Sequence, residues 1–580
     1  PFFILQRYYL SKMTSLFIQA PCSVTLNWED ASSSLATGLE MYLDLCLSLE
    51  TKYPRVASTS NLVDRIDSKL TGLYSNMEQQ LFRSRGALAR TRNRLASPLY
   101  RFPEEILSQI FMEVIHDHHP TSEGIAPLSM EDHLTYTYRG LHTLIRVCSV
   151  WKNVALRRAA LWSTIPILNS AFGSSTGYQM YQETKLSLQR AVGAGLHFAG
   201  VLGVGDYRKT GLLVDYIPRF QTINIKSQYL RSIHDFLEMV LNSGIPSSLQ
   251  ELSINHVHHI NCKRSESLPH DIDYLSFHGC HHRPTFNQLI RSVSVLRVSG
   301  IPFHWETINF SARLVELRVQ EVTLGYESEL NHFLKAVASA TQLRELTIIS
   351  LSAFPDPLDS DIPSPVSVEL PNLQSLYIQD LYFNVLDRIL TNINPGSHRL
   401  TLYLTEKSLC TGNLEAGSFE EDEVDPSDLC ELLGNTPIDT LMLYGHCGEH
   451  WVEGPVLRQI LSSIPKLKTL KMSHWDFDTE CLDALERRPR EPFPRLQNLH
   501  ITGTKIYDID GLKNVISSHP IRNLDIGASI WKGDMFMQVW DRLEPGSDLA
   551  NWLKSQVRNV RLRKFSYEAP EFLTATWQLW

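Results

Sequence analysis

The sequence predicts a mainly α/β chain in which an N-terminal helical region precedes a curved solenoid, with short parallel strands inside and helices outside. The first observation behind this prediction is an apolar-x-x-apolar-x-apolar motif that recurs twelve times, once in degenerate form, between Phe220 and Ile526. The second is that stretches with helical spacing of apolar residues separate several successive copies. Alternation of one strand and one helix at a near-constant period is typical of a solenoid, in which each repeat contacts its neighbours.

The N-terminal region begins with a poorly defined segment, residues 1–55. The chain starts at Pro1, Met13 offers an alternative start, and the opening stretch is too short and irregular for a signal peptide. Residues 56–97 predict an amphipathic helix, because apolar residues recur there at steps of three, four or seven. These residues are Leu62, Ile66, Leu70, Leu73, Met77, Leu81, Leu88 and Leu95. Its arginine-rich end leaves two interpretations open, a coiled-coil or partner surface, or a solvated face on a helix that packs against its own domain.

Residues 98–168 contain two stretches that are dense in large apolar side chains, "RFPEEILSQIF" at 101–111 and "VCSVWKNVALRRAALWSTI" at 147–165. Pro103 suits the first turn of a helix, where its missing N–H costs nothing, and the two glutamates after it complement the helix dipole. The apolar face that follows consists of Ile106, Leu107, Ile110, Phe111 and Val114. Exposed apolar faces of this kind usually mark a partner. The alternative is that they dock against the helix of residues 61–95.

A connector, residues 169–199, leads to the repeat array, residues 200–567, and to a tail, residues 568–580. The middle apolar position of the motif advances by about 27 residues per repeat between Ile223 and Leu524, within the range of roughly 20–29 that leucine-rich repeats show. Because side chains alternate along a strand, both apolar residues of L-x-L share one face, and the residue between them points to the concave face. We therefore expect Leu317, Leu346 and Leu470 to be almost fully buried.

The array resembles the degenerate, long-helix leucine-rich repeats of intracellular eukaryotic proteins, although the asparagine ladder of the standard repeat is absent. A doubly wound α/β domain would explain the alternation of strands and helices, but not so many equal steps. Two insertions interrupt the array. Residues 411–428 carry most of a run of eight carboxylates without Lys or Arg, and we expect a solvated, mobile loop, with a docking site for a basic partner as the alternative. Residues 354–365 hold four prolines and predict another loop.

Bulk properties exclude several classes of protein. The net charge of −9 and the pI near 6.2 disfavour nonspecific binding of nucleic acid. Nine cysteines without a CxxC pair argue against a disulfide framework and favour a reducing compartment. No run approaches the ~18 apolar residues that a transmembrane helix needs. We therefore expect no nucleic-acid or membrane partner, and a cytoplasmic and/or nuclear location.

Histidine and cysteine clusters raise the question of a metal site. The clusters are His256, His258, His259 and Cys262, and His278, Cys280, His281 and His282. No two of these residues have the C-x2-C or H-x3-H spacing of common zinc sites, so loop histidines are the favoured interpretation. Nucleotide-binding, hydrolase and zinc-protease motifs are absent from the sequence. We predict no enzyme activity, and no catalytic, cofactor-binding or metal-binding residues.

The two apolar stretches together resemble an F-box, in the form common in fungal F-box proteins. The usual signature is Leu-Pro-x-Glu-Ile/Leu-Leu, then Ile-Phe, then Val-Cys-x-x-Trp, then Leu-Trp. Phe102 stands where Leu is usual, and the matching positions are Pro103, Glu105, Ile106, Leu107, Ile110, Phe111, Cys148, Trp151, Leu161 and Trp162. The insertion between the halves, roughly residues 117–140, is longer than in a minimal F-box. The resemblance covers about 70 residues of the 580.

The resemblance implies a substrate adaptor without an active site of its own. F-box proteins bind the Skp-type subunit of cullin–RING ubiquitin ligases and present substrates on a C-terminal module, often leucine-rich repeats. Here the Skp-type adaptor, and through it cullin, would be bound by Phe102, Pro103, Ile106, Leu107, Ile110 and Trp151, and an unknown protein substrate by the repeats. Two alternatives remain open, a non-catalytic leucine-rich-repeat scaffold with no ubiquitin role, and a metal-dependent enzyme built on the histidine clusters.

Overall fold

The computed structural model describes residues 23–52, 60–96, 102–116, 128–168, 174–204, 210–257, 274–275, 282–356, 366–415, 418–445, 450–533 and 540–579. The chain divides into two compact units, residues 1–101 and residues 102–580. Each unit is described below by itself.

The first unit contains two long helices, α2 (Ser23–Lys52) and α3 (Ser60–Ala96). The predicted helix of residues 61–95 is confirmed in α3, whereas α2 lies within residues 1–55, which were expected to be poorly defined. Most apolar side chains of α3 remain exposed, among them Leu70, Leu81 and Leu95. The apolar stripe of α3 is therefore largely uncovered by the described residues of its own unit.

The second unit begins with three helices, α4 (Glu104–His116), α5 (Met130–Val147) and α6 (Ser149–Arg157). Ser129 caps α5, because its hydroxyl accepts a hydrogen bond from the Asp132 backbone N–H at 3.2 Å. The three helices bury Phe111 and Trp162 completely, and the Trp162 Nε1–H donates to the Ala155 carbonyl at 2.8 Å. Together with Leu107, these residues belong to the same apolar core as the repeats.

One long sheet follows, in which neighbouring strands occur in chain order. Its strands are β1 (Thr164–Ile167), β2 (Leu196–Leu202), β3 (Phe220–Ser227), β4 (Glu251–His256), β5 (Val295–Ser299), β6 (Glu316–Gln320), β8 (Glu345–Ile349), β10 (Ser375–Gln379), β11 (Arg399–Leu404), β14 (Thr440–Tyr444), β15 (Thr469–Ser473), β17 (Asn498–Ile506) and β18 (Asn523–Trp531), with β16 (Asp476–Phe477), β19 (Trp540–Arg542) and β20 (Asn559–Leu562) at its end. All of these pairs are parallel except β18 with β19. A doubly wound sheet would reverse its strand order, so the sequential order excludes that alternative.

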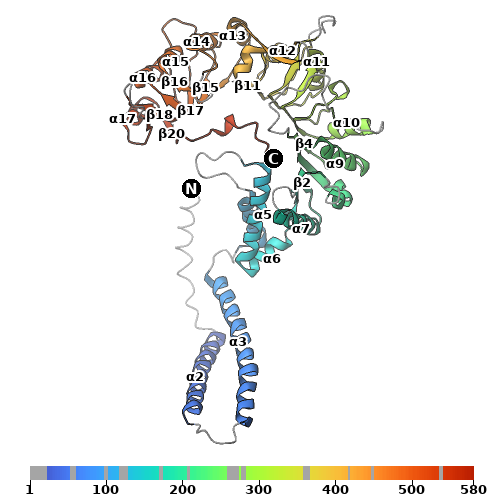
Figure 1. Cartoon of the computed structure of the whole chain (residues 1–580), viewed down its shortest axis with the longest axis vertical. Coiled ribbons are helices and arrows are strands. Elements are labelled where there is room, and N and C mark those ends of the chain that lie inside the picture. Colours follow the sequence, from blue (N-terminus) through green and yellow to red (C-terminus); the bar gives the residue numbers. More distant parts are fainter. Residues whose placement is uncertain are drawn as a thin grey trace. The chain divides into compact units, whose positions relative to one another are not determined.

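The register aligns the repeats position by position. Leu317 lies opposite Leu346, and Leu470 lies between Leu441 and Leu499. The predicted burial of Leu317, Leu346 and Leu470 is confirmed, since none of the three exceeds 1% exposure. The helices lie on the outer side of the resulting arc, and the strands line its inner side (Figure 1). These helices are α7 (Ser174–Arg190), α9 (Leu230–Asn242), α10 (His282–Ser292), α11 (Glu327–Ala338), α12 (Phe383–Asn392), α13 (Pro426–Gly434), α14 (Gly454–Ser463), α15 (Thr479–Leu485), α16 (Ile509–Ser518) and α17 (Asp548–Gln556).

Two expectations about the array are corrected. The sheet begins at Thr164 rather than near residue 200, because β1 and β2 pair in parallel within the predicted F-box and connector segments. No strand lies between β4 and β5, which pair directly, and of the motif copy around Leu275 only residues 274–275 are described. Leu275 is nevertheless buried and contributes to the core. The six-residue apolar motif therefore indicates that its apolar side chains are buried. It does not by itself indicate that the segment pairs as a strand, because pairing also needs a neighbouring strand at the right distance.

The described carboxylates of the acidic insertion are exposed, as its composition predicts, but the segment is not a loop. Strands β12 (Cys410–Glu415) and β13 (Ser418–Glu423) form an antiparallel hairpin. The Phe419 ring of this hairpin contacts the rings of Tyr382 and Phe354, with centroids 5.9 and 6.0 Å apart. Phe419 therefore anchors a segment that its acidic composition alone would predict to be a loop. Of the proline-rich insertion, residues 357–365 lie outside the described residues, and β9 (Ser352–Phe354) pairs with β7 (Thr323–Tyr326) just before it.

Candidate functional sites

An apolar face is exposed along α4. Ile106, Ile110 and Val114 are four residues apart in α4 and therefore lie on one side of the helix, and Phe102 lies just before its first residue. The exposed fractions of Phe102, Ile106, Ile110 and Val114 are 44%, 41%, 37% and 52%, which are high for large apolar side chains. Pro103 is also exposed at the start of the helix. We call these five residues the α4 face.

The opposite side of α4 serves the core. Leu107 is only 2% exposed and packs with Phe111 and Ile115. The predicted contact between Leu107 and a partner stays untested, and the neighbours of Leu107 already bury it. Trp151 is half-buried, and its ring lies 5.0 Å from that of Phe111. Trp151 thus supports α4 from α6 and presents at most part of its ring to a partner.

A shallow depression of about 760 Å³ adjoins the α4 face. Its lining includes Ile106 and Ile110, and Ala159 and Ala160 of the short helix η2 (Ala159–Trp162). The Arg158 side chain also lines it and donates from Nε to the Ser108 hydroxyl at 3.0 Å. This hydrogen bond ties η2 to α4, so the depression and the α4 face form one fixed surface.

A second surface is the concave face of the sheet, which the C-terminal segment covers. We call residues 563–579 the C-terminal strap. The strap leaves the last strand, β20, and runs along the inner side of the arc back to its first strands (Figure 1). The Arg563 guanidinium first pairs with the Asp525 carboxylate, with Nε and Oδ1 2.9 Å apart, and lies over the Tyr567 ring.

The middle of the strap carries an acidic residue followed by an aromatic one. The Glu571 carboxylate lies 2.8 Å from Lys471 Nζ and 3.7 Å from His500 Nδ1. The Phe572 ring packs against Tyr403 and Tyr444, with centroids 5.5 and 6.1 Å away. These contacts form a small apolar cluster, with Met442 and Ala569, that is separate from the main core of the array.

Farther along, concave-face side chains hold the backbone of the strap. Arg318 donates to the Thr574 carbonyl, and Gln320 Nε2 donates to the Ala575 carbonyl at 3.1 Å. The Thr574 hydroxyl donates to Gln379 Oε1 at 2.6 Å and lies 3.0 Å from the Tyr377 hydroxyl. Burial raises the pKa of Tyr377 to about 12, against the opposing effects of the Thr574 hydrogen bond and the Arg318 charge. Tyr377 is thus a neutral hydrogen-bonding group at physiological pH.

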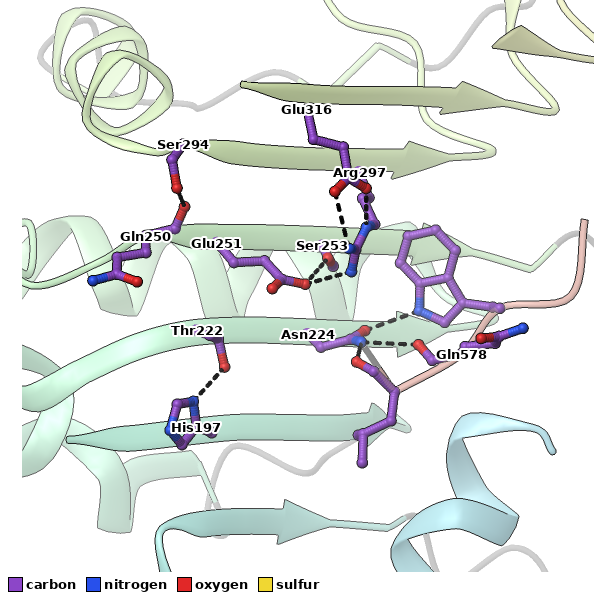
Figure 2. A network of polar contacts seen from close by, with 12 residues as sticks. His197, Thr222, Asn224, Gln250, Glu251, Ser253, Ser294, Arg297, Glu316 and Gln578 are labelled. Atoms are coloured by element: carbon purple, nitrogen blue, oxygen red, sulfur yellow. Dashed lines mark hydrogen bonds and ion pairs between the residues drawn. The ribbon is translucent and has the colours of Figure 1, made fainter. Parts of the chain in front are cut away.

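The end of the strap docks on the first repeats (Figure 2). Asn224 on β3 uses its whole amide: its Oδ1 accepts from Trp577 Nε1 at 2.9 Å, and its Nδ2 donates to the carbonyls of Gln578, at 3.1 Å, and Leu579. Leu579 is fully buried in a second small cluster, which includes Met130 and Leu134 of α5. The strap therefore links the last repeat to the helical segment that precedes the sheet.

Next to this point the concave face carries a partly buried ion-pair network. The Arg297 guanidinium lies between two carboxylates, 2.6 Å from Glu251 Oε1 and 2.7 Å from Glu316 Oε1 (Figure 2). Burial raises the pKa of Glu251, and the Arg297 charge opposes that rise. All three charges are therefore satisfied within the sheet.

The histidine clusters lie almost entirely outside the described residues. Among the clustered residues, His256 is described in full, and its Nδ1 lies 3.3 Å from the Gly300 carbonyl oxygen. Elsewhere, Glu306, Glu329 and His332 bring possible ligand atoms within 4.8 Å of one another. His332 Nδ1 lies 3.4 Å from Glu329 Oε2, an ion-pair distance that explains the proximity without a metal. The absence of metal and catalytic chemistry stays a prediction.

None of the described helices is long and apolar enough to cross a lipid bilayer.

Comparison with known proteins adds little. No family model and no curated protein matches this sequence. A solved structure of a TLR13–ssRNA13 complex matches with a TM-score of 0.23 and 14% identity, over 50% of this chain and 44% of that chain. The match spans less than half the length of that protein, and at this TM-score it carries no argument about fold or function. The architecture therefore depends on the strand order and register described above.

The concave-face ligands of the strap were not foreseen from the sequence. Alternation along the strands places Asn224, Arg318, Tyr377 and Lys471 on the concave face, but it does not indicate what they contact. A signal was present in the tail, where Phe565, Tyr567, Phe572, Trp577, Leu579 and Trp580 fall within sixteen residues. Such a density of large apolar side chains is unusual for a solvated terminus.

Proposed function

We propose that this chain is the substrate-recognition subunit of a Skp–cullin–F-box ubiquitin ligase. The observation that supports the proposal is the α4 face, four large apolar side chains and a proline exposed beside a preformed depression. Surfaces of this kind rarely remain uncovered on a monomer. They lie where the F-box-like signature places the contact with the Skp-type adaptor.

In this proposal the chain acts by proximity rather than by chemistry. The α4 face binds the adaptor, and the repeat array holds a protein substrate near the ubiquitin-conjugating enzyme. Holding two reactants on one assembly raises their effective concentration, so substrate lysines meet the charged enzyme more often. No side chain of this chain needs to react.

The first prediction tests the α4 face with the double variant Ile106→Asp and Ile110→Asp. Both side chains are more than a third exposed, so the changes should leave the fold intact while placing two charges in an apolar interface. Buried anchors of an interface each carry about 2 kcal/mol or more, so affinity for purified Skp-type adaptor should fall by at least ~100-fold. Isothermal titration calorimetry on full-length protein measures this affinity.

The matched control is Val192→Asp, which places the same charge on another exposed apolar residue. It should retain the affinity of the unchanged protein, and circular dichroism should show that all three proteins are folded. Absence of adaptor binding by the unchanged protein, or equal affinity of all three, would leave the scaffold interpretation in place of this one. Leu107 is a poor test site, because truncating a core residue reports on folding rather than on binding.

A further inference from the structure

The C-terminal strap behaves as a bound ligand rather than as part of the core. The main apolar core extends from Leu107 to Val557 without any strap residue. The strap adds two small separate clusters, around Phe572 and around Leu579. Most other contacts of the strap are made by polar side chains on the concave side of the strands. Without the strap, these side chains would be exposed to solvent. The repeats therefore have an apolar core of their own that does not include the strap.

Part of this recognition is independent of side-chain identity. Arg318, Gln320 and Asn224 donate hydrogen bonds to four backbone carbonyls of the strap, from Thr574 to Leu579. Backbone carbonyls occur in every peptide, so these donors can hold any chain that follows the same path.

The remaining contacts select side chains. Lys471 and His500 receive a carboxylate, and Tyr403 and Tyr444 receive an aromatic ring directly after it. Asn224 Oδ1 accepts from an indole five residues farther on, and α5 buries an aliphatic side chain two residues after that. In the strap these positions are Glu571, Phe572, Trp577 and Leu579.

We propose that the concave face is a binding site for an acidic–aromatic segment of a partner protein that follows the turns of the strap, and that the strap occupies this site as an intramolecular competitor. The identification of the partner as a ubiquitin-ligase substrate rests on the function proposed above. The binding site on the concave face and the chemistry of its ligand do not depend on that function. A tethered ligand has an effective concentration of about millimolar, so even weak strap contacts keep the groove closed until a partner of the same chemistry displaces it.

The test measures binding of a fluorescent peptide with the sequence of residues 566–579 to full-length protein. In the released variant, Phe572→Ala with Trp577→Ala, the strap loses its aromatic anchors while the groove stays unchanged. The released variant should bind the peptide at least ~10-fold more tightly than the unchanged protein, because the competitor is weakened. Glu571→Lys serves as a second, milder release variant if the double variant fails to fold.

Peptide variants test the side-chain contacts. Peptides with Glu571→Lys or Trp577→Ala should each bind the released variant about 10-fold or more weakly, as expected for loss of a central contact. Gln578→Ala and Glu568→Ala are matched controls, because both side chains are exposed and only the Gln578 backbone is held. A further Lys471→Glu change in the released protein should weaken binding of the original peptide and restore binding of the Glu571→Lys peptide.

Folded release variants that do not bind the peptide, or that bind a scrambled peptide equally well, would overturn the proposal. So would equal peptide affinity in released and unchanged protein. Adaptor affinity is measured on the same preparations, and none of these changes lies on the α4 face. Loss of peptide binding with intact adaptor binding therefore rejects the groove alone, and the reverse rejects the ubiquitin-ligase assignment alone.

Discussion

At the scale of single residues, the charges around Glu571 show how the strap is held. Burial by itself would raise the pKa of the Glu571 carboxyl, but the hydrogen bond and charge of Lys471, with help from a backbone hydrogen bond and His500, hold that pKa below its ordinary value. Burial lowers the pKa of His500, and the nearby charges of Lys471 and Arg561 lower it further. The charges of Glu571 and Asp525 oppose this shift. The site therefore favours an ionised glutamate and a neutral histidine.

The second prediction follows from the sign of these shifts. A histidine whose pKa is lower in the folded state stabilises docking above its ordinary pKa of about 6.5, and that stability is lost as the pH falls below it. A glutamate with a lowered pKa stabilises docking above about 4.3 and loses this effect as the pH falls further. The strap should therefore loosen in two stages on acidification. Hydrogen exchange of residues 566–579, corrected for intrinsic rates, measures it.

Two variants separate the stages of this acid response. His500→Gln should remove the stage nearer neutrality, and Glu571→Gln should remove the lower one while loosening the strap already at pH 7. Unchanged protection of the strap between pH 7.5 and pH 4 would contradict the assignment.

At the scale of elements, the β12–β13 hairpin shows a conflict between composition and packing. Its carboxylates favour solvent, and its strand pairing alone is marginal, since isolated hairpins are barely stable in water. The Phe419 ring provides the missing contact with Tyr382 and Phe354, and the Tyr382 hydroxyl donates to Glu421 Oε1 at 2.8 Å. The hairpin is thus ordered by one ring and one hydrogen bond to the outer part of the array.

The third prediction concerns that ring. Phe419→Ala should accelerate hydrogen exchange in residues 410–423 and lower global stability by only about 1–3 kcal/mol, because each aromatic pair contributes roughly 0.5–1.5 kcal/mol beyond the area it buries. Urea denaturation with peptide-resolved hydrogen exchange measures both effects. Glu423→Ala, an exposed change in the same hairpin, should alter stability by less than about 0.5 kcal/mol. Equal exchange in the two variants would mean that the ring is not the anchor.

At the scale of the whole array, stability comes from stacked repeats that share one apolar core. Each middle leucine faces its equivalents in the neighbouring strands, as Leu470 faces Leu441 and Leu499. Solenoids of this kind derive their stability from each repeat and from its interfaces with the next. A cavity in one repeat therefore also weakens the two interfaces that it shares.

The fourth prediction is that Leu470→Ala lowers the free energy of unfolding by about 2–5 kcal/mol, the range for truncation of a fully buried leucine. Exchange should accelerate first in β14, β15 and β17. Val204→Ala, at a 75% exposed position, is the control and should change stability by less than about 0.5 kcal/mol. A loss spread evenly over all strands, or no loss at all, would argue against local stacking as the source of stability.

The sequence by itself determined those features that depend on local periodicity. The spacing of apolar residues predicted α3, α4 and helices between several of the strands, and the L-x-L motif predicted the parallel strands and the burial of Leu317 and Leu470. A helix or strand exposes one face at a fixed interval, so a short window of sequence contains the whole signal. For the same reason the α4 segment could be recognised as a partner surface, as an expectation that adaptor binding will test.

Only the tertiary structure decided which side of a local element is covered. On α4, Leu107 and Ile106 are neighbours in one apolar run, yet packing against α5 and α6 buries the first and leaves the second exposed. Phe419 anchors an acidic hairpin because two rings from other repeats lie within reach. The strap contacts Asn224 across 353 residues of sequence, through Trp577. No local pattern encodes such a contact, because it exists only once the array has curved and brought its first strands within reach of its last residues.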